Sequence, residues 1–200
     1  TPPAATPSPV NNPPAPQPGP RDLDAILLEL EEIEGTSPNL EDPVADHAAR
    51  FERVEDIACE AAEFGLKTLP LVHKRLVEAR ALPKEVGYLQ RSEFLCHVFA
   101  RLAAGEVPAL EETAKLLGTL TPAELDATCE ALPRGRASYV LAGWLGQLSS
   151  PPGPNEGATR LALLRRYAKS TKTLDRPLLA TLAKDPDAKV AAAASELNAR

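Results

Sequence analysis

Three histidines are the residues of this chain best suited to acid–base or metal chemistry. They stand at positions 47, 73 and 97, and no second histidine or acid lies four residues from His73. We expect His47 at the edge of the hydrophobic core, and His97 on a solvated helical stripe that it shares with Glu93 and Arg101. Zinc bound by these histidines would need ligands brought together from different helices. The sequence therefore predicts no metal site.

Sequence motifs and paired acids are the other signals of catalysis. The chain contains no G-x-S-x-G, H-E-x-x-H, P-loop or G-x-G-x-x-G pattern. The acidic pairs at 111–112 and 185/187 stand near expected helix starts and turns, where capping and the helix dipole favour negative charge. We predict no catalytic residue, no cofactor and no enzymatic activity. The alternative, an enzyme with an interhelical site, would require a pocket that gathers His73 or His97 with acids from other helices.

The three cysteines, Cys59, Cys96 and Cys129, lie far apart and form no C-x-x-C spacing. An odd and sparse set argues against a disulfide framework and favours a reducing compartment such as the cytoplasm. We expect all three to be small buried residues on helices rather than redox groups or metal ligands.

Positive charge is concentrated in the last third of the chain. Residues 1–133 contain 11 Lys or Arg and 23 Asp or Glu, a net charge of −12, whereas residues 134–200 contain 11 and 5, a net charge of +6. Either these cations form a solvated face that balances the acidic part, or they form a basic ridge that can hold phosphates. The candidate interaction surface comprises Arg134, Arg136, Arg160, Arg165, Arg166, Lys169 and Lys172.

The composition favours an all-α fold. Hydrophobic residues make up 44% of the chain but aromatic residues only 4%, so Leu, Ala and Val must fill the core, which suits closely packed helices. No strand-like alternation occurs, and no apolar run reaches the 18 residues of a membrane span. We expect about nine to ten helices with irregular spacing, at 22–34, 42–64, 69–81, 83–104, 108–120, 121–132, 136–148, 155–168 and a final pair within 174–200.

We divide the chain into three parts. Residues 1–21 form a Pro-rich linker, because nine of the 21 prolines lie in the first 20 positions, which contain no charged side chain; a ligand for a proline-binding groove is the alternative. Residues 22–41 form an acidic amphipathic helix and a link. Either the acidic face of this helix is only solvated, or the helix is a detachable docking element. Residues 42–200 form an all-α helical-repeat domain. Because the chain begins at Thr1 and lacks methionine, we expect it to be part of a longer protein.

One aromatic side chain stands between two glycines in an apolar helix. Gly143 and Gly146 flank Trp144, and each glycine costs about 1 kcal/mol of helix stability relative to alanine. Their presence predicts a close helix approach or a bend, with Trp144 packed in the core.

The last helix pair carries a recognisable pattern. Leucines recur every four residues from Leu174 to Leu182, and small and branched residues recur at helical spacing from Val190 to Leu197, on either side of the turn at 184–187. This pattern resembles the HEAT-type repeats of bacterial α-solenoids, although Ala191 replaces the arginine that such repeats often have. The resemblance covers about one repeat, with weak internal similarity between residues 116–132 and 178–197. It implies helix pairs stacked into a superhelix.

These features together favour a non-enzymatic protein–protein interaction or scaffold module built on an irregular HEAT-like α-solenoid. The alternative is a HEAT-like domain that binds nucleic acid through the basic C-terminal third.

Overall fold

The fold is all-α, as the sequence predicts. The computed structural model describes residues 21–35, 43–81, 88–153 and 156–199, and these contain no β-strand. In these ranges, no helix combines the length and the apolar character that crossing a bilayer requires. The α-helices are α1 (Leu23–Gly35), α2 (Pro43–Glu63), α3 (Thr68–Arg80), α4 (Tyr88–Ala103), α5 (Val107–Leu116), α6 (Pro122–Glu130), α7 (Ala137–Leu148), α8 (Gly157–Ser170), α9 (Arg176–Leu182) and α10 (Ala188–Asn198).

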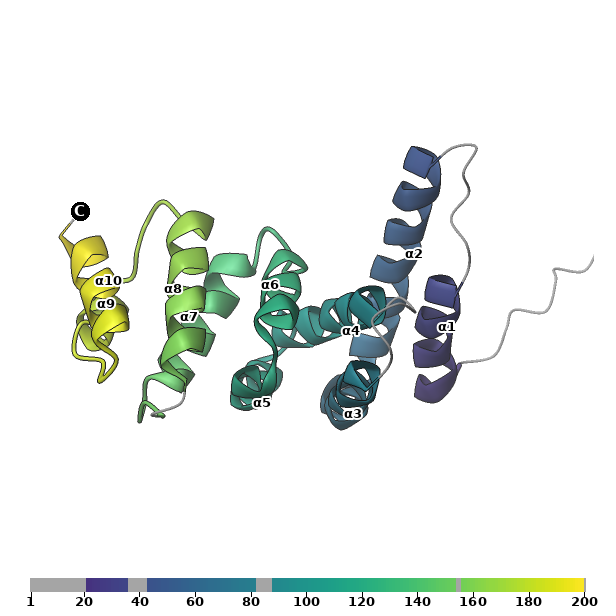
Figure 1. Cartoon of the computed structure of the whole chain (residues 1–200), viewed down its shortest axis with the longest axis horizontal. Helices are drawn as coiled ribbons and strands as arrows, with labels where there is room; N and C mark the ends of the chain where they lie inside the picture. The colour runs from purple at the N-terminus through teal and green to yellow at the C-terminus, as the bar shows by residue number, and fades with distance from the viewer. Residues whose placement is uncertain (1–20, 36–42, 82–87, 154–155, 200) are drawn as a thin grey trace, which may run out of the picture.

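The helices follow one another along the long axis of the molecule (Figure 1), with α1 and α2 near one end and α9 and α10 at the other. Helix α4 packs against α2, α3, α5 and α6, whereas α7 pairs with α8 and α10 packs against both α8 and α9. Because α7 and α8 run in opposite directions, the start of α7 and the end of α8 lie at the same edge.

Side-chain caps explain where several helices begin. Asp22, Asp175 and Asp187 each accept a hydrogen bond from a backbone N–H of the following first turn, at 2.7 to 3.0 Å. Thr121 and Glu124 form a capping box before α6, each side chain accepting from the other's backbone N–H. Just after the last residue of α2, Gly65 has a φ of +63°, a left-handed conformation that glycine adopts without strain.

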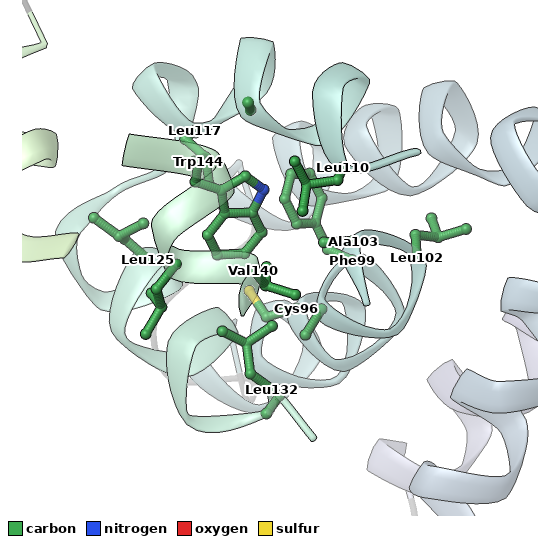
Figure 2. Packing of buried hydrophobic residues seen from close by; sticks show 14 of the residues in the cluster. Cys96, Phe99, Leu102, Ala103, Leu110, Leu117, Leu125, Leu132, Val140 and Trp144 are labelled. Carbon is green, nitrogen blue, oxygen red and sulfur yellow. The ribbon is translucent and has the colours of Figure 1, made fainter. Parts of the chain in front are cut away.

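The centre of the core lies between α4 and α7 (Figure 2). Residues 95–100 of α4 are buried without interruption. Trp144 of α7 is fully buried, its ring centroid lies 6.4 Å from that of Phe99, and its indole Nε1–H donates to Thr113 Oγ1 at 3.0 Å. The predicted core position of Trp144 is therefore confirmed, and its polar atom is satisfied.

The two glycines beside Trp144 differ. A Cβ added at Gly143 would lie 2.8 Å from a terminal carbon of Leu110, so α7 approaches α5 closely there, whereas a Cβ at Gly146 would have no neighbour within 4 Å. The first glycine therefore permits a close helix approach, one of the two expected causes, and the second does not mark one.

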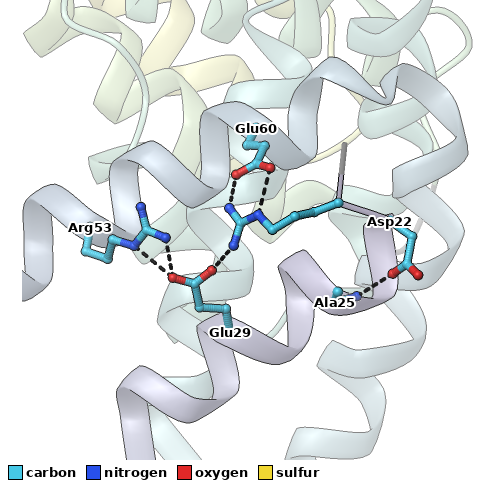
Figure 3. Close-up of polar contacts among 6 residues, drawn as sticks. Asp22, Ala25, Glu29, Arg53 and Glu60 are labelled. Atoms are coloured by element: carbon cyan, nitrogen blue, oxygen red, sulfur yellow. Dashed lines mark hydrogen bonds and ion pairs between the residues drawn. The ribbon is translucent and has the colours of Figure 1, made fainter. Parts of the chain in front are cut away.

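Helix α1 is docked on α2 by burial and by charge. Ile26 and Leu27 are fully buried, and the guanidinium of Arg21 bonds both Glu29 and Glu60 (Figure 3), with its Nε 3.1 Å from Glu60. Burial alone would raise the pKa of Glu29, but hydrogen bonds from Arg53 and Arg21 outweigh it, so the pKa of this carboxyl is lowered. Helix α1 thus shares the core of the domain expected to begin at residue 42.

A second arginine joins α3 to α6. Arg80 donates from Nε and Nη2 to the two carboxylate oxygens of Glu124, at 2.9 and 2.6 Å, and also to the carbonyl of Thr119 at 2.9 Å. The Glu124 side chain is almost fully buried. Burial would raise the pKa of Glu124, but the Arg80 hydrogen bonds and the Thr121 N–H hold it below its usual range.

Glycine substitutions should separate packing from helix propensity. A Cβ at Gly157 would lie 2.1 Å from Asp187 Oδ2, so Gly157→Ala must displace the carboxylate that caps α10. We expect it to lower the free energy of unfolding by about 1 kcal/mol. The matched change Gly146→Ala, which meets no atom, should raise it by about 0.5–1 kcal/mol. Urea unfolding followed by circular dichroism measures both; equal effects would contradict the close contact.

The Glu124 carboxylate should make stability depend on pH. Because its folded pKa is lowered, its contribution is present above the ordinary glutamate pKa of about 4.3 and is lost as pH falls towards the folded value. We expect Glu124→Gln to reduce the free energy of unfolding by about 1–3 kcal/mol at pH 7 and to flatten its decline between about pH 5 and pH 3. The control is Glu111→Gln, an exposed residue of α5. An undiminished acid dependence in the Glu124 variant would refute this assignment.

Candidate interaction surface

Five of the seven predicted surface cations are exposed, and they belong to two helix ends that lie at one edge. Two stand before α7 and three in the second half of α8 or just after it, and the start of α7 and the end of α8 meet at this edge (Figure 1). Among the described residues, none of the five makes an ion pair or a side-chain hydrogen bond. We call this group the basic edge: Arg134, Arg136, Arg165, Lys169 and Lys172.

Arg166 lies beside the basic edge but is already paired. Its Nη2 is 2.9 Å from Asp126 and 3.1 Å from Glu130, both on α6. The hydrogen bond to Asp126 raises the pKa of Arg166, burial lowers it, and the bond to Glu130 raises it again, with a net increase. This side chain joins α8 to α6 and is less available to a ligand than its neighbours.

Arg160 is not part of the surface, which corrects the sequence-based assignment. The side chain is fully buried, and its Nε and Nη2 donate to the carboxylate of Asp185 at 2.7 and 2.9 Å. Its Nη1 donates to the carbonyl of Gly153 at 2.9 Å. Arg160 therefore ties the first turn of α8 to the turn between α9 and α10.

A sequence signal for this burial existed. Arg160 stands three, four and seven residues before Leu163, Leu164 and Tyr167, all of which are buried. It thus belongs to the core-facing stripe of α8 and not to the stripe of Arg165 and Lys169. Its charge concealed this position, because arginine is rarely buried without a partner.

One exposed aromatic side chain accompanies the basic edge. Tyr139, in the first turn of α7, is 50% exposed. Trp144 and Tyr167, the other aromatic residues of the basic third, are buried, and the Tyr167 hydroxyl accepts a hydrogen bond from the Asp175 N–H at 3.0 Å. Of these three rings, Tyr139 alone could stack on a ligand.

The two described histidine side chains, those of His73 and His97, do not form a metal or catalytic cluster. His97 is buried, and its Nδ1 lies 2.7 Å from Glu55, so the predicted solvated position is wrong. His73 is bonded through Nε2 to the Thr119 hydroxyl at 3.0 Å, and the His47 side chain lies outside the described residues. Within the described part of the chain, no three His, Cys, Asp or Glu side chains could hold a metal ion together.

The expected burial of the three cysteines is found for some of them and not for others. All three thiols are free; Cys96 is buried, and burial raises the pKa of the half-buried Cys129 to about 12. Cys59 is exposed, so its predicted burial is wrong. The reason is its position on α2, which turns it away from the buried stripe of Val54, Ile57 and Ala61.

A solvent-open hollow lies between the end of α7 and α9, with a volume of about 370 Å³. Its lining contains no histidine or cysteine, and its one carboxylate, Asp185, is bonded to Arg160. The lining residues are Ser149, Pro152, Ala180, Thr181, Lys184 and Asp185. This set offers no free acid–base pair.

No protein-family model, curated protein or solved structure matches the chain. Its function must be inferred from the chemistry of its own surface. Of the seven expected site residues, the five of the basic edge are exposed and form no ion pair with any described residue.

Two arginines on α8 should respond in opposite ways to substitution. Arg160→Ala leaves the buried Asp185 carboxylate without its partner, and we expect a loss of about 3–5 kcal/mol in the free energy of unfolding. Arg165→Ala removes an exposed, unpaired cation and should change it by less than about 0.5 kcal/mol. Chemical denaturation measures both. Similar losses in the two variants would contradict the assignment of Arg160 to the interior.

Proposed function

We propose that this chain is a non-enzymatic protein-interaction module built on a HEAT-like α-solenoid. Contacts of α7 with α8, α8 with α10, and α9 with both α7 and α10 support a stack of helix pairs. The buried link from Arg160 to Asp185 supports a fixed spacing between the last two pairs. A stack of this kind exposes an extended surface, which is how repeat proteins bind their partners.

The observation that carries the proposal is the unpaired state of the basic edge. Elsewhere many charges are paired, as in the Arg21–Glu29, Arg80–Glu124 and Arg160–Asp185 contacts. Arg165 and Lys169 instead stand four residues apart on one exposed helical face. An acidic segment of a partner protein would complement this face, and charge complementarity would orient it.

Nucleic-acid binding is the second candidate, favoured by the exposed Tyr139 close to Arg136. The surroundings favour a protein partner, because Asp126 and Glu130 flank the basic edge with carboxylates that are 60% and 68% exposed. These charges would repel a continuous phosphate backbone more than a short acidic segment.

Direct binding measurements distinguish the two functions. Fluorescence anisotropy would compare a labelled Glu-rich peptide with single-stranded and duplex oligonucleotides, over a range of salt concentrations. We expect the peptide to bind more tightly, and the double variant Arg165→Glu/Lys169→Glu to weaken binding by about tenfold or more. The matched control is Lys184→Glu/Lys189→Glu. It makes the same charge change at two exposed lysines beside the turn between α9 and α10.

Two further arms complete this experiment. Deleting residues 1–20 keeps α1 in the core and should leave peptide binding unchanged if the helical domain carries it. Tighter binding of an oligonucleotide through the same two cations would establish the second function. Failure of every ligand to bind at low ionic strength would refute both.

A further inference from the structure

Helix α2 carries an exposed acidic stripe that has no partner within the described residues. Glu52, Asp56 and Glu63 are exposed and are spaced four and seven residues apart, so they share one helical face. Cys59 lies on the same face, and its pKa is raised first by partial burial and then by the charges of Asp56 and Glu63. We call Glu52, Asp56 and Glu63 the acidic stripe.

The acidic stripe differs from the other acids of α2. Glu55 is paired with Arg101, and Glu60 with Arg21, both on the sides of α2 that face other elements of the domain. The carboxylates of the stripe lie on the side of α2 opposite the buried Val54, Ile57 and Ala61. These carboxylates are therefore accessible to a basic surface of another molecule.

The acidic stripe and the basic edge match in spacing but cannot meet within one molecule. Glu52 and Asp56 are four residues apart, as are Arg165 and Lys169, which places each pair about 6 Å apart along its helix. In Figure 1, α2 lies near one end of the molecule and α8 near the other. Two copies arranged head to tail would bring the two surfaces together.

We propose that the basic edge of one copy binds the acidic stripe of a second copy. The inference rests on the proposed function, because the same surface would receive the acidic partner, and self-association would occupy it when that partner is absent. The contact is heterologous, because it joins two different surfaces. In a pair, one copy keeps a free acidic stripe and the other a free basic edge, so further copies can add at both ends. Two helix faces bury less area than a standard stable interface, so the association is transient and sensitive to salt.

Sedimentation velocity on the intact chain tests this inference, between about 20 and 300 mM salt, a range over which screening of exposed charges changes strongly. We expect the average mass of the wild-type chain to rise with protein concentration at low salt and to return to that of the monomer at high salt. Maleimide labelling of Cys59 should slow under the associating conditions, because the neighbouring stripe is covered.

Charge-reversal variants identify the two surfaces. Arg165→Glu/Lys169→Glu and Glu52→Lys/Asp56→Lys should each remain monomeric, because each lacks one surface. Mixed together, they should regain the salt-sensitive association, because the intact stripe of one variant meets the intact edge of the other and the two reversed surfaces are also complementary. Glu106→Lys/Glu111→Lys, which alters exposed acids at the start of α5, should associate as the wild type does.

Several outcomes would overturn the inference: a wild-type chain that is monomeric at every salt concentration, association that survives either charge reversal, or mixed variants that form no complex. None of these would affect binding of the Glu-rich peptide to the basic edge. Failure of self-association is therefore distinguishable from failure of the proposed function. All six substituted side chains are exposed, and circular dichroism would verify that each variant keeps its helices.

Discussion

The buried ion pair between Arg160 and Asp185 constrains the C-terminal part of the molecule. A guanidinium with no solvent exposure must have its charge compensated and its N–H groups satisfied, and here Asp185 and the Gly153 carbonyl do both. Asp185 also accepts the Asp187 N–H, and Asp187 caps α10. The position of α10 on α8 therefore depends on one cation. Because Arg160 is buried in the first turn of α8, the exposed cations of this helix lie at its opposite end, in the basic edge.

A similar division of charge is seen elsewhere among the described residues. Arginines that reach across helices are paired: Arg21 joins α1 to α2, and Arg80 joins α3 to α6. Among the described residues, the acidic stripe of α2 and the basic edge at α7 and α8 are left unpaired. Internal pairing thus supports the fold, and the remaining charges give the molecule two complementary surfaces near opposite ends.

Much of the secondary structure was predictable because its causes are local. The caps at Asp22, Thr121 and Asp187 and the glycine after α2 act within one turn of chain, and the helices begin and end close to them. Burial of Trp144 followed from its apolar neighbours. Burial of His97 and exposure of Cys59 did not, since each depends on which face of a helix another helix covers.

The sequence by itself determined that the chain is helical, where several of its helices start, and that its last third is basic. The tertiary structure decided which cations are available, because Arg160 and Arg165 stand five residues apart on one helix and differ only in which face the neighbouring helices cover. It also decided that α1 belongs to the core, through the contact of Arg21 with Glu60. Local propensity and composition act along the chain, whereas burial and ion pairing depend on residues that are distant in sequence and adjacent in space.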